Sequence, residues 1–145
     1  MLFRSHPKEE TTALLLEFQS GALGTFLLSD VTPSPWTWEQ ATGENPNFPN
    51  TTQNVYRFIG SKASLDFPNL LLWRHAGNEP DWLHEISPEV IENEIGDAYA
   101  EQIRHFCAVI KGKEEPRINA VDATKTLKAT LAVFEASEKG VGIRL

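Results

Sequence analysis

The hydrophobic and polar positions in the first part of the chain predict two strands. In residues 11–18, Leu14, Leu16 and Phe18 fall on one side of an extended backbone, and Ala13, Leu15 and Glu17 fall on the other. A second strand candidate, residues 22–29, follows Gly21, which can adopt the positive φ that tight turns require. A period of two is typical of a β-strand, so the pattern predicts a β-hairpin.

Further short segments have the same strand-like composition. Residues 53–59, 63–67 and 70–74 are three candidates, and residues 82–86 are a fourth. Strands that follow one another closely along a chain pair mostly through hairpins, so we expect antiparallel neighbours.

The period changes in the last third of the chain. Tyr99, Ile103, Phe106 and Ile110 step by four, three and four residues, which is one stripe of an amphipathic helix. Gly112 lies just beyond this stripe, where a helix commonly ends.

A second helix is predicted to begin after Asn119, which can cap it, with Asp122 three positions later. Gly140 ends this helix, and residues 142–145 are predicted to close as a short strand. The apolar stripe of the helix is Ala120, Thr124, Leu127, Leu131 and Phe134.

Strands first and helices last define an α+β fold. We expect an open, largely antiparallel β-sheet with the two C-terminal helices packed on one face. At 145 residues, the chain has the length of a single domain, 1–145. Its longest apolar stretches are four or five residues, and its first residues have no apolar segment of signal-peptide length, so we expect no membrane association.

Charge changes this picture in one respect. Thirteen Lys and Arg against twenty Asp and Glu give a net charge of −7, which argues against a nucleic-acid partner. Eight acidic residues lie between Ala76 and Ile103 without a basic one, which indicates a solvated acidic edge or, alternatively, a cation site that lacks the EF-hand ligand pattern. They are Glu79, Asp81, Glu85, Glu89, Glu92, Glu94, Asp97 and Glu101.

Motifs for known chemistry are missing from the sequence. It contains no glycine-rich dinucleotide or phosphate loop, no Gly-x-Ser-x-Gly elbow and no zinc-ligand spacing, so we assign no catalytic, cofactor-binding or metal-binding residue. The only cysteine, Cys107, favours a reducing, cytoplasmic compartment. The histidines are scattered, and we expect His105 to form hydrogen bonds rather than to catalyse; they are His6, His75, His84 and His105.

The connection from Asp30 to Thr52 is long, rich in proline and aromatic residues, and is the most informative segment. Asp30, Trp36, Trp38 and Glu39 are candidates to line a sugar or polyol pocket, because aromatic rings pack on sugar C–H surfaces and carboxylates accept hydroxyl protons. Alternatively, the two tryptophans fold the loop back onto the sheet or fill a subunit contact. A hydrolase that uses Asp30 and Glu39 as paired carboxylates is a third hypothesis.

Four segments follow one another in a characteristic order: the hairpin Glu17–Phe26, the hairpin Tyr56–Leu65, the helix Tyr99–Gly112 and the closing helix from Ile118 to Ser137. Together they resemble the C-terminal domain of the Gfo/Idh/MocA oxidoreductases, relatives of glucose-fructose oxidoreductase and inositol dehydrogenase. Ala63 stands where the family's second hairpin commonly has glycine.

The resemblance implies a substrate-binding and oligomerisation domain of an NAD- or NADP-dependent sugar or polyol oxidoreductase. It also implies a homodimer formed through the exposed sheet face. The family's Rossmann domain, its catalytic Glu-Lys-Pro lysine and its Asp-x-x-x-His segment have no counterpart here; Lys113–Pro116 lies in the connection between the helices.

We therefore expect no redox activity from this chain alone, and a Rossmann domain supplied in cis or in trans. The second hypothesis is a stand-alone sugar- or polyol-binding or assembly module without a redox role.

Overall fold

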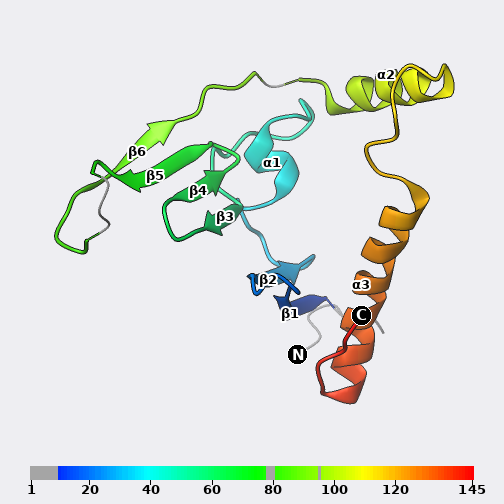
Figure 1. Cartoon of the computed structure of the whole chain (residues 1–145), viewed down its shortest axis with the longest axis horizontal. Coiled ribbons are helices and arrows are strands. Elements are labelled where there is room, and N and C mark those ends of the chain that lie inside the picture. Colours follow the sequence, from blue (N-terminus) through cyan, green and yellow to red (C-terminus); the bar gives the residue numbers. More distant parts are fainter. Residues whose placement is uncertain (1–9, 78–80, 95) are drawn as a thin grey trace. The chain divides into compact units, whose positions relative to one another are not determined.

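The computed structural model describes residues 10–77, 81–94 and 96–145, which form six strands and three helices (Figure 1). These elements fall into two compact units, which are described separately. The hairpin–helix unit consists of Met1–Thr32 and His105–Leu145, and the sheet unit is Pro33–Arg104.

The hairpin–helix unit begins with the predicted hairpin. Strands β1 (Thr11–Glu17) and β2 (Leu23–Ser29) are antiparallel, with Leu14 opposite Phe26. The turn between them closes at Gly21, whose φ of 86° lies in the left-handed region that glycine adopts without strain. The hairpin prediction is confirmed.

Both C-terminal helices are confirmed, and both end at a predicted glycine. Helix α2 (Ala98–Ile110) stops where Gly112, at φ 65°, turns the backbone and lets Lys113 N–H donate to the Ala108 carbonyl at 2.9 Å. This geometry is a Schellman motif, which satisfies carbonyls that the helix end leaves without partners.

Helix α3 (Ala120–Lys139) begins and ends with caps that its sequence predicts. The side chain of Asn119 accepts from the backbone N–H of Asp122 at 3.0 Å, and Gly140 ends the helix at φ 65°. Beyond it, residues 142–145 form no strand, contrary to prediction, because no described strand pairs with them. An isolated four-residue segment cannot satisfy its backbone groups as a strand.

The sheet unit contains an antiparallel meander with the spatial order β3-β4-β5-β6. Its connections are short, as expected for strands that follow one another directly. The strands are β3 (Tyr56–Ile59), β4 (Ser64–Phe67), β5 (Leu71–His75) and β6 (Ile86–Val90).

Strand β6 lies four residues later than the predicted strand at 82–86. Asp81 prevents that earlier strand, since its carboxylate accepts from Leu83 N–H at 3.2 Å and its carbonyl accepts from His84 N–H at 3.0 Å. These bonds fold the backbone at Trp82 into a turn, in which an Asp side chain replaces a ladder partner.

The strands thus form two separate sheets rather than the single open sheet that we expected, although the α+β class and the antiparallel pairing are confirmed. The two C-terminal helices, α2 and α3, follow the strands along the chain as predicted, and neither has a fully buried residue. Among the described apolar residues, Ala41 alone is buried.

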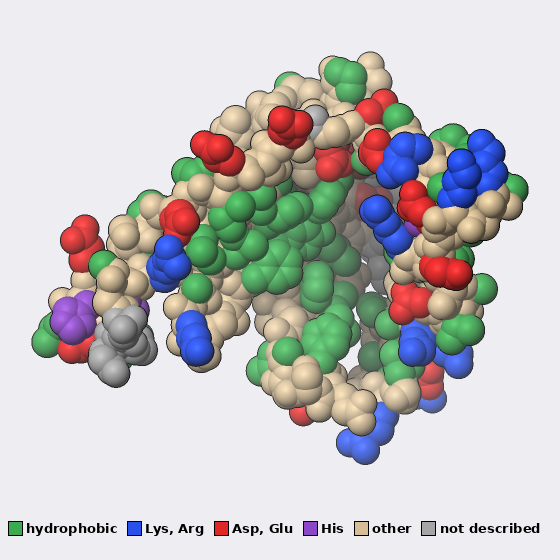
Figure 2. Space-filling model, turned by 45° about the horizontal axis from the view of Figure 1, so that its top comes forward, with side chains coloured by type: hydrophobic (Ala, Val, Ile, Leu, Met, Phe, Trp, Pro, Cys, Tyr) green, Lys and Arg blue, Asp and Glu red, His purple; other side chains and the backbone are tan. Residues whose placement is uncertain are grey.

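The register assigns the residues of the four-stranded sheet to two faces. Directly opposite residues share a face, so Tyr56, Phe67, Leu65 and Leu72 lie together. The opposite face, here called the Ile86/Val90 face, carries Ile59, Leu71, Trp73, Ile86 and Val90. Figure 2 shows hydrophobic side chains gathered over this sheet. No helix of the described residues is long and apolar enough to cross a membrane.

Candidate functional site

A short helix stands inside the segment that we predicted to be a long connection. Helix α1 (Trp38–Thr42) begins after Thr37, whose hydroxyl accepts from the backbone N–H of Gln40 at 3.3 Å, and ends at Gly43 with φ 70°. Glu39 occupies its first turn, where a carboxylate is favourable. A Thr cap, an early acid and a closing glycine were local signals that could have predicted this helix.

Trp38 holds α1 against the sheet. Its ring stacks on Phe67, with centroids 5.5 Å apart and planes 26° apart, and lies 6.1 Å from the Tyr56 ring. Tyr56 and Phe67 face each other across β3 and β4 and lie 6.2 Å apart. The structure therefore supports, for Trp38, the interpretation that the tryptophan folds the loop back onto the sheet.

Trp36 is placed differently. The residue is 62% exposed, and its ring makes none of the aromatic contacts that join Trp38 to the sheet. The backbone around it is nevertheless held: Trp36 N–H donates to Ser34 Oγ at 3.1 Å, and Thr51 Oγ1 donates to the Pro35 carbonyl at 2.7 Å. Trp36 thus presents a large apolar ring to solvent from an ordered backbone.

The residues that hold the loop lie at its far end, and none of them is among the candidates predicted from the sequence. Thr51 N–H donates to the Gln40 carbonyl at 2.7 Å, and Thr52 N–H donates to Asn50 Oδ1 at 2.7 Å. Asn50 also packs against Gly43, where an added Cβ would lie 2.5 Å from Asn50 Nδ2. Hydroxyl and amide side chains at a proline-rich turn were the available signal.

The two candidate carboxylates belong to different units. Asp30 directly follows β2 in the hairpin–helix unit, and its N–H donates to the Glu10 carbonyl at 3.2 Å. Glu39 lies with Trp36 and Trp38 in the sheet unit. Three of the four candidate residues thus share one unit, and the structure gives no geometry for Asp30 and Glu39 as a catalytic pair.

A second polar cluster, which the sequence did not predict, links three strands on the Ile86/Val90 face. Asp66 accepts from the Trp73 indole Nε1–H at 3.0 Å and pairs with Arg57 Nε at 3.3 Å. The side chain of Asp66 is mostly buried, so its charge is compensated by these two donors. This cluster ties β3, β4 and β5 together.

Comparison with known protein families assigns the chain. The family model described as "Oxidoreductase family, C-terminal alpha/beta domain" matches residues 2–145. The chain belongs to the Gfo/Idh/MocA oxidoreductase family. Searches of curated proteins and of solved structures each found no match.

The match covers both units of this Gfo/Idh/MocA domain and confirms the resemblance inferred from its hairpins and helices. The family is one of NAD(P)-type oxidoreductases. The alignment of the chain to the C-terminal model also agrees with the mixed helix and strand content of the structure.

Three carboxylates of the acidic stretch in this Gfo/Idh/MocA domain form ion pairs or hydrogen bonds. Glu89 pairs with Arg74, Glu101 pairs with Arg104, and Asp97 Oδ1 accepts from a backbone N–H at the start of α2. Glu79 and His6 lie outside the described residues. Within the described part of the chain, no three His, Cys, Asp or Glu side chains are grouped to hold a metal ion.

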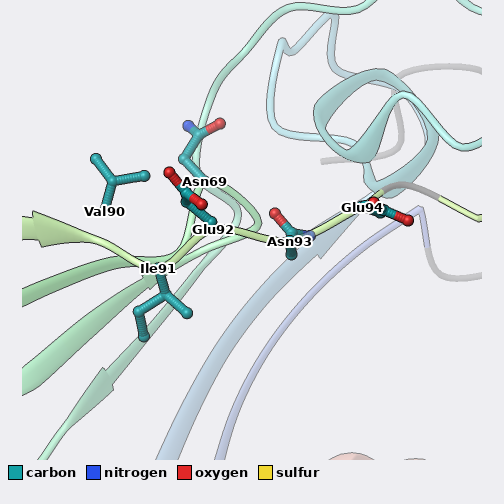
Figure 3. Close-up of a pocket in the computed structure, with 6 residues that line it drawn as sticks. All are labelled: Asn69, Val90, Ile91, Glu92, Asn93 and Glu94. Atoms are coloured by element: carbon teal, nitrogen blue, oxygen red, sulfur yellow. The ribbon is translucent and has the colours of Figure 1, made fainter.

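An open groove of about 670 Å³ lies at the end of β6 (Figure 3). Ile91 N–H donates to the Leu70 carbonyl at 3.0 Å and so keeps the chain beside the β4–β5 turn. Two carboxylates line the groove, but none of the four candidate site residues does. The lining residues are Asn69, Val90, Ile91, Glu92, Asn93 and Glu94.

Proposed function

We propose that this domain binds the substrate and forms the subunit contacts of an NAD(P)-dependent oxidoreductase that acts on a sugar or polyol. One observation carries the proposal: the Trp36 ring is exposed on a loop whose backbone is held by Thr51 and Ser34. An ordered aromatic platform suits the C–H surface of a sugar ring, because little conformational freedom is lost on binding.

One carboxylate completes the proposed pocket within the sheet unit. Glu39 lies on α1, three residues after Trp36, and can accept hydrogen bonds from substrate hydroxyl groups. Asp30, which follows β2 in the hairpin–helix unit, is proposed separately as a substrate-binding residue. In this proposal Trp38 contributes by fixing α1 on the sheet, since it stacks on Phe67.

Hydride transfer requires a nicotinamide beside the reacting carbon and a group that accepts the proton. The sequence has no glycine-rich dinucleotide loop, so we propose that a Rossmann domain, in cis or in trans, binds NAD or NADP. We propose a cytoplasmic location on the basis of the single cysteine, Cys107.

Titration of the full chain with myo-inositol, glucose and NADH tests the proposal. We expect saturable binding of a polyol or sugar and no saturable binding of NADH. Trp36→Ala should weaken polyol binding about tenfold, which is the effect of losing about 1.4 kcal/mol of ring contact. Trp82→Ala is the matched control, because Trp82 is fully exposed but lies on the β5–β6 turn.

Micromolar NADH binding would overturn the assignment of the cofactor to another domain. Equal loss of binding in the Trp36 and Trp82 variants would refute the proposed platform. The DNA upstream of the Met1 codon separates the redox domain from the stand-alone binding module: a Rossmann-coding segment there supports the former, and its lack supports the latter.

A further inference from the structure

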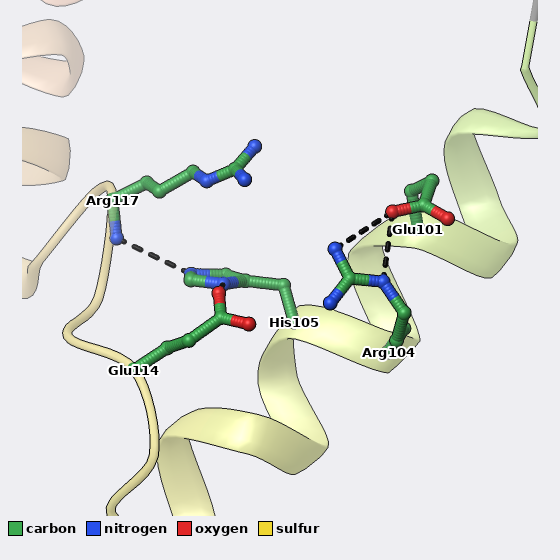
Figure 4. Close-up of polar contacts among 5 residues, drawn as sticks. All are labelled: Glu101, Arg104, His105, Glu114 and Arg117. Carbon is green, nitrogen blue, oxygen red and sulfur yellow. Dashed lines mark hydrogen bonds and ion pairs between the residues drawn. The ribbon is translucent and has the colours of Figure 1, made fainter.

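The side chain of His105 lies between helix α2 and the connection that follows it (Figure 4). Its Nδ1 is 2.7 Å from Glu114 Oε2, and its Nε2 is 3.4 Å from the backbone nitrogen of Arg117. The imidazole is mostly buried, with 18% of its surface exposed, although no residue of its helix is fully buried. One ring therefore contacts two points of the connection.

These partners determine which ring nitrogen carries the proton. A backbone N–H can only donate, so Nε2 must accept from Arg117 and carry no hydrogen. Nδ1 then carries the hydrogen and donates to the Glu114 carboxylate, which makes a charge-assisted bond. Figure 4 shows this contact drawn from the backbone nitrogen of Arg117 to the imidazole.

The position of these contacts gives them a structural role. The Schellman turn at Gly112 ends α2 and reverses the chain, Glu114 follows two residues later, and Arg117 precedes the Asn119 cap of α3 by two residues. Both ring nitrogens of His105 form hydrogen bonds to the connection between α2 and α3.

We propose that His105, as the Nδ1–H tautomer, is a positioning residue that closes residues 105–117 into a loop and thereby fixes where α3 begins. This role of His105 in the connection between the helices does not depend on the substrate proposed above.

Nuclear magnetic resonance on the full chain tests this proposal. The imidazole ¹⁵N spectrum should show a protonated Nδ1 and an unprotonated Nε2. In His105→Phe, which keeps an aromatic ring without polar atoms, the Arg117 amide should exchange with solvent about tenfold faster, as expected when one hydrogen bond is lost. The Ile110 amide, inside α2, serves as the internal reference.

Two conservative variants separate the two contacts. His105→Gln can place its carbonyl near the Nε2 position and should restore slow exchange at Arg117. His105→Asn can place its amide donor near the Nδ1 position and should not restore it. A protonated Nε2 in the native chain, or unchanged Arg117 exchange in His105→Phe, would overturn the proposal. The native tautomer decides the matter even if a variant fails to fold.

Discussion

Two tryptophans separated by a single residue have opposite environments in this domain. Trp38 stacks on Phe67, whereas the Trp36 ring is exposed. Trp38→Ala should therefore destabilise the sheet unit by about 2 kcal/mol, less than a fully buried aromatic residue because Trp38 is 40% exposed. Trp36→Ala should change the free energy of unfolding by less than about 0.5 kcal/mol. Urea denaturation of both variants measures the difference; equal losses would contradict the assignment.

The sequence alone left these two tryptophans equivalent. Both interpretations, a ligand platform and an anchor on the sheet, fitted a pair of rings in a proline-rich loop. The partner that decides between them, Phe67, belongs to β4 and is remote in sequence. Residue-scale roles that depend on such distant contacts cannot be predicted from local pattern. Gly21 required no distant partner, and its positive φ was predicted correctly.

At the scale of elements, the end of α1 offers a test of the loop's packing. Gly43 has φ 70°, and an alanine Cβ there would lie 2.5 Å from Asn50 Nδ2. Gly43→Ala should destabilise the domain by about 1–2 kcal/mol through the left-handed backbone alone, with a further cost from the contact. When Asn50→Ala is added to Gly43→Ala, it should remove the cost of the contact but not the cost of the left-handed backbone.

A double-mutant cycle over Gly43 and Asn50 measures that coupling. We expect the double variant to be more stable than the sum of the two single losses predicts. Strict additivity would show that Asn50 moves away at no cost, and that the loop is not closely packed at this point.

Element boundaries were predictable where the signal was local. Asn119, Gly112 and Gly140 marked the helix ends correctly because a cap depends on residues within one turn. The position of β6 was wrong because Trp82 and Leu83 have the composition of a strand, whereas the side chain of Asp81 competes for the backbone. A pattern of hydrophobic residues does not predict a side chain that bonds to the backbone in place of a strand partner.

At the scale of the whole molecule, the sequence predicted the α+β class and the antiparallel pairing but not the division of the strands between two sheets. Pattern and turn length determine which strands are neighbours in a meander. They do not determine whether the β1–β2 hairpin joins β3, because the intervening loop contains a helix and its own anchors, such as Thr51. The family match, which covers 2–145, depends on the whole pattern.

The proposed homodimer is best tested on strand β6, which offers one residue for each face. Val90, 64% exposed, belongs to the Ile86/Val90 face, whereas Ser87 points to the opposite face of the same strand. The Trp38 contacts with Tyr56 and Phe67 lie on that opposite face, so the Ile86/Val90 face is the one to test for the proposed subunit contact. Exposed apolar faces of this kind are typical of sites where proteins associate.

Val90→Lys should shift the full chain from dimer to monomer in analytical ultracentrifugation, because a charge buried at an apolar interface loses its hydration. Ser87→Lys adds the same charge on the same strand and should leave the dimer intact. Dissociation caused by Ser87→Lys alone would place the contact on the Trp38 side of the sheet. A native chain that is monomeric at all concentrations would refute the homodimer itself. It would leave the proposed polyol site open to its own test, because both Trp36 and Glu39 belong to one chain.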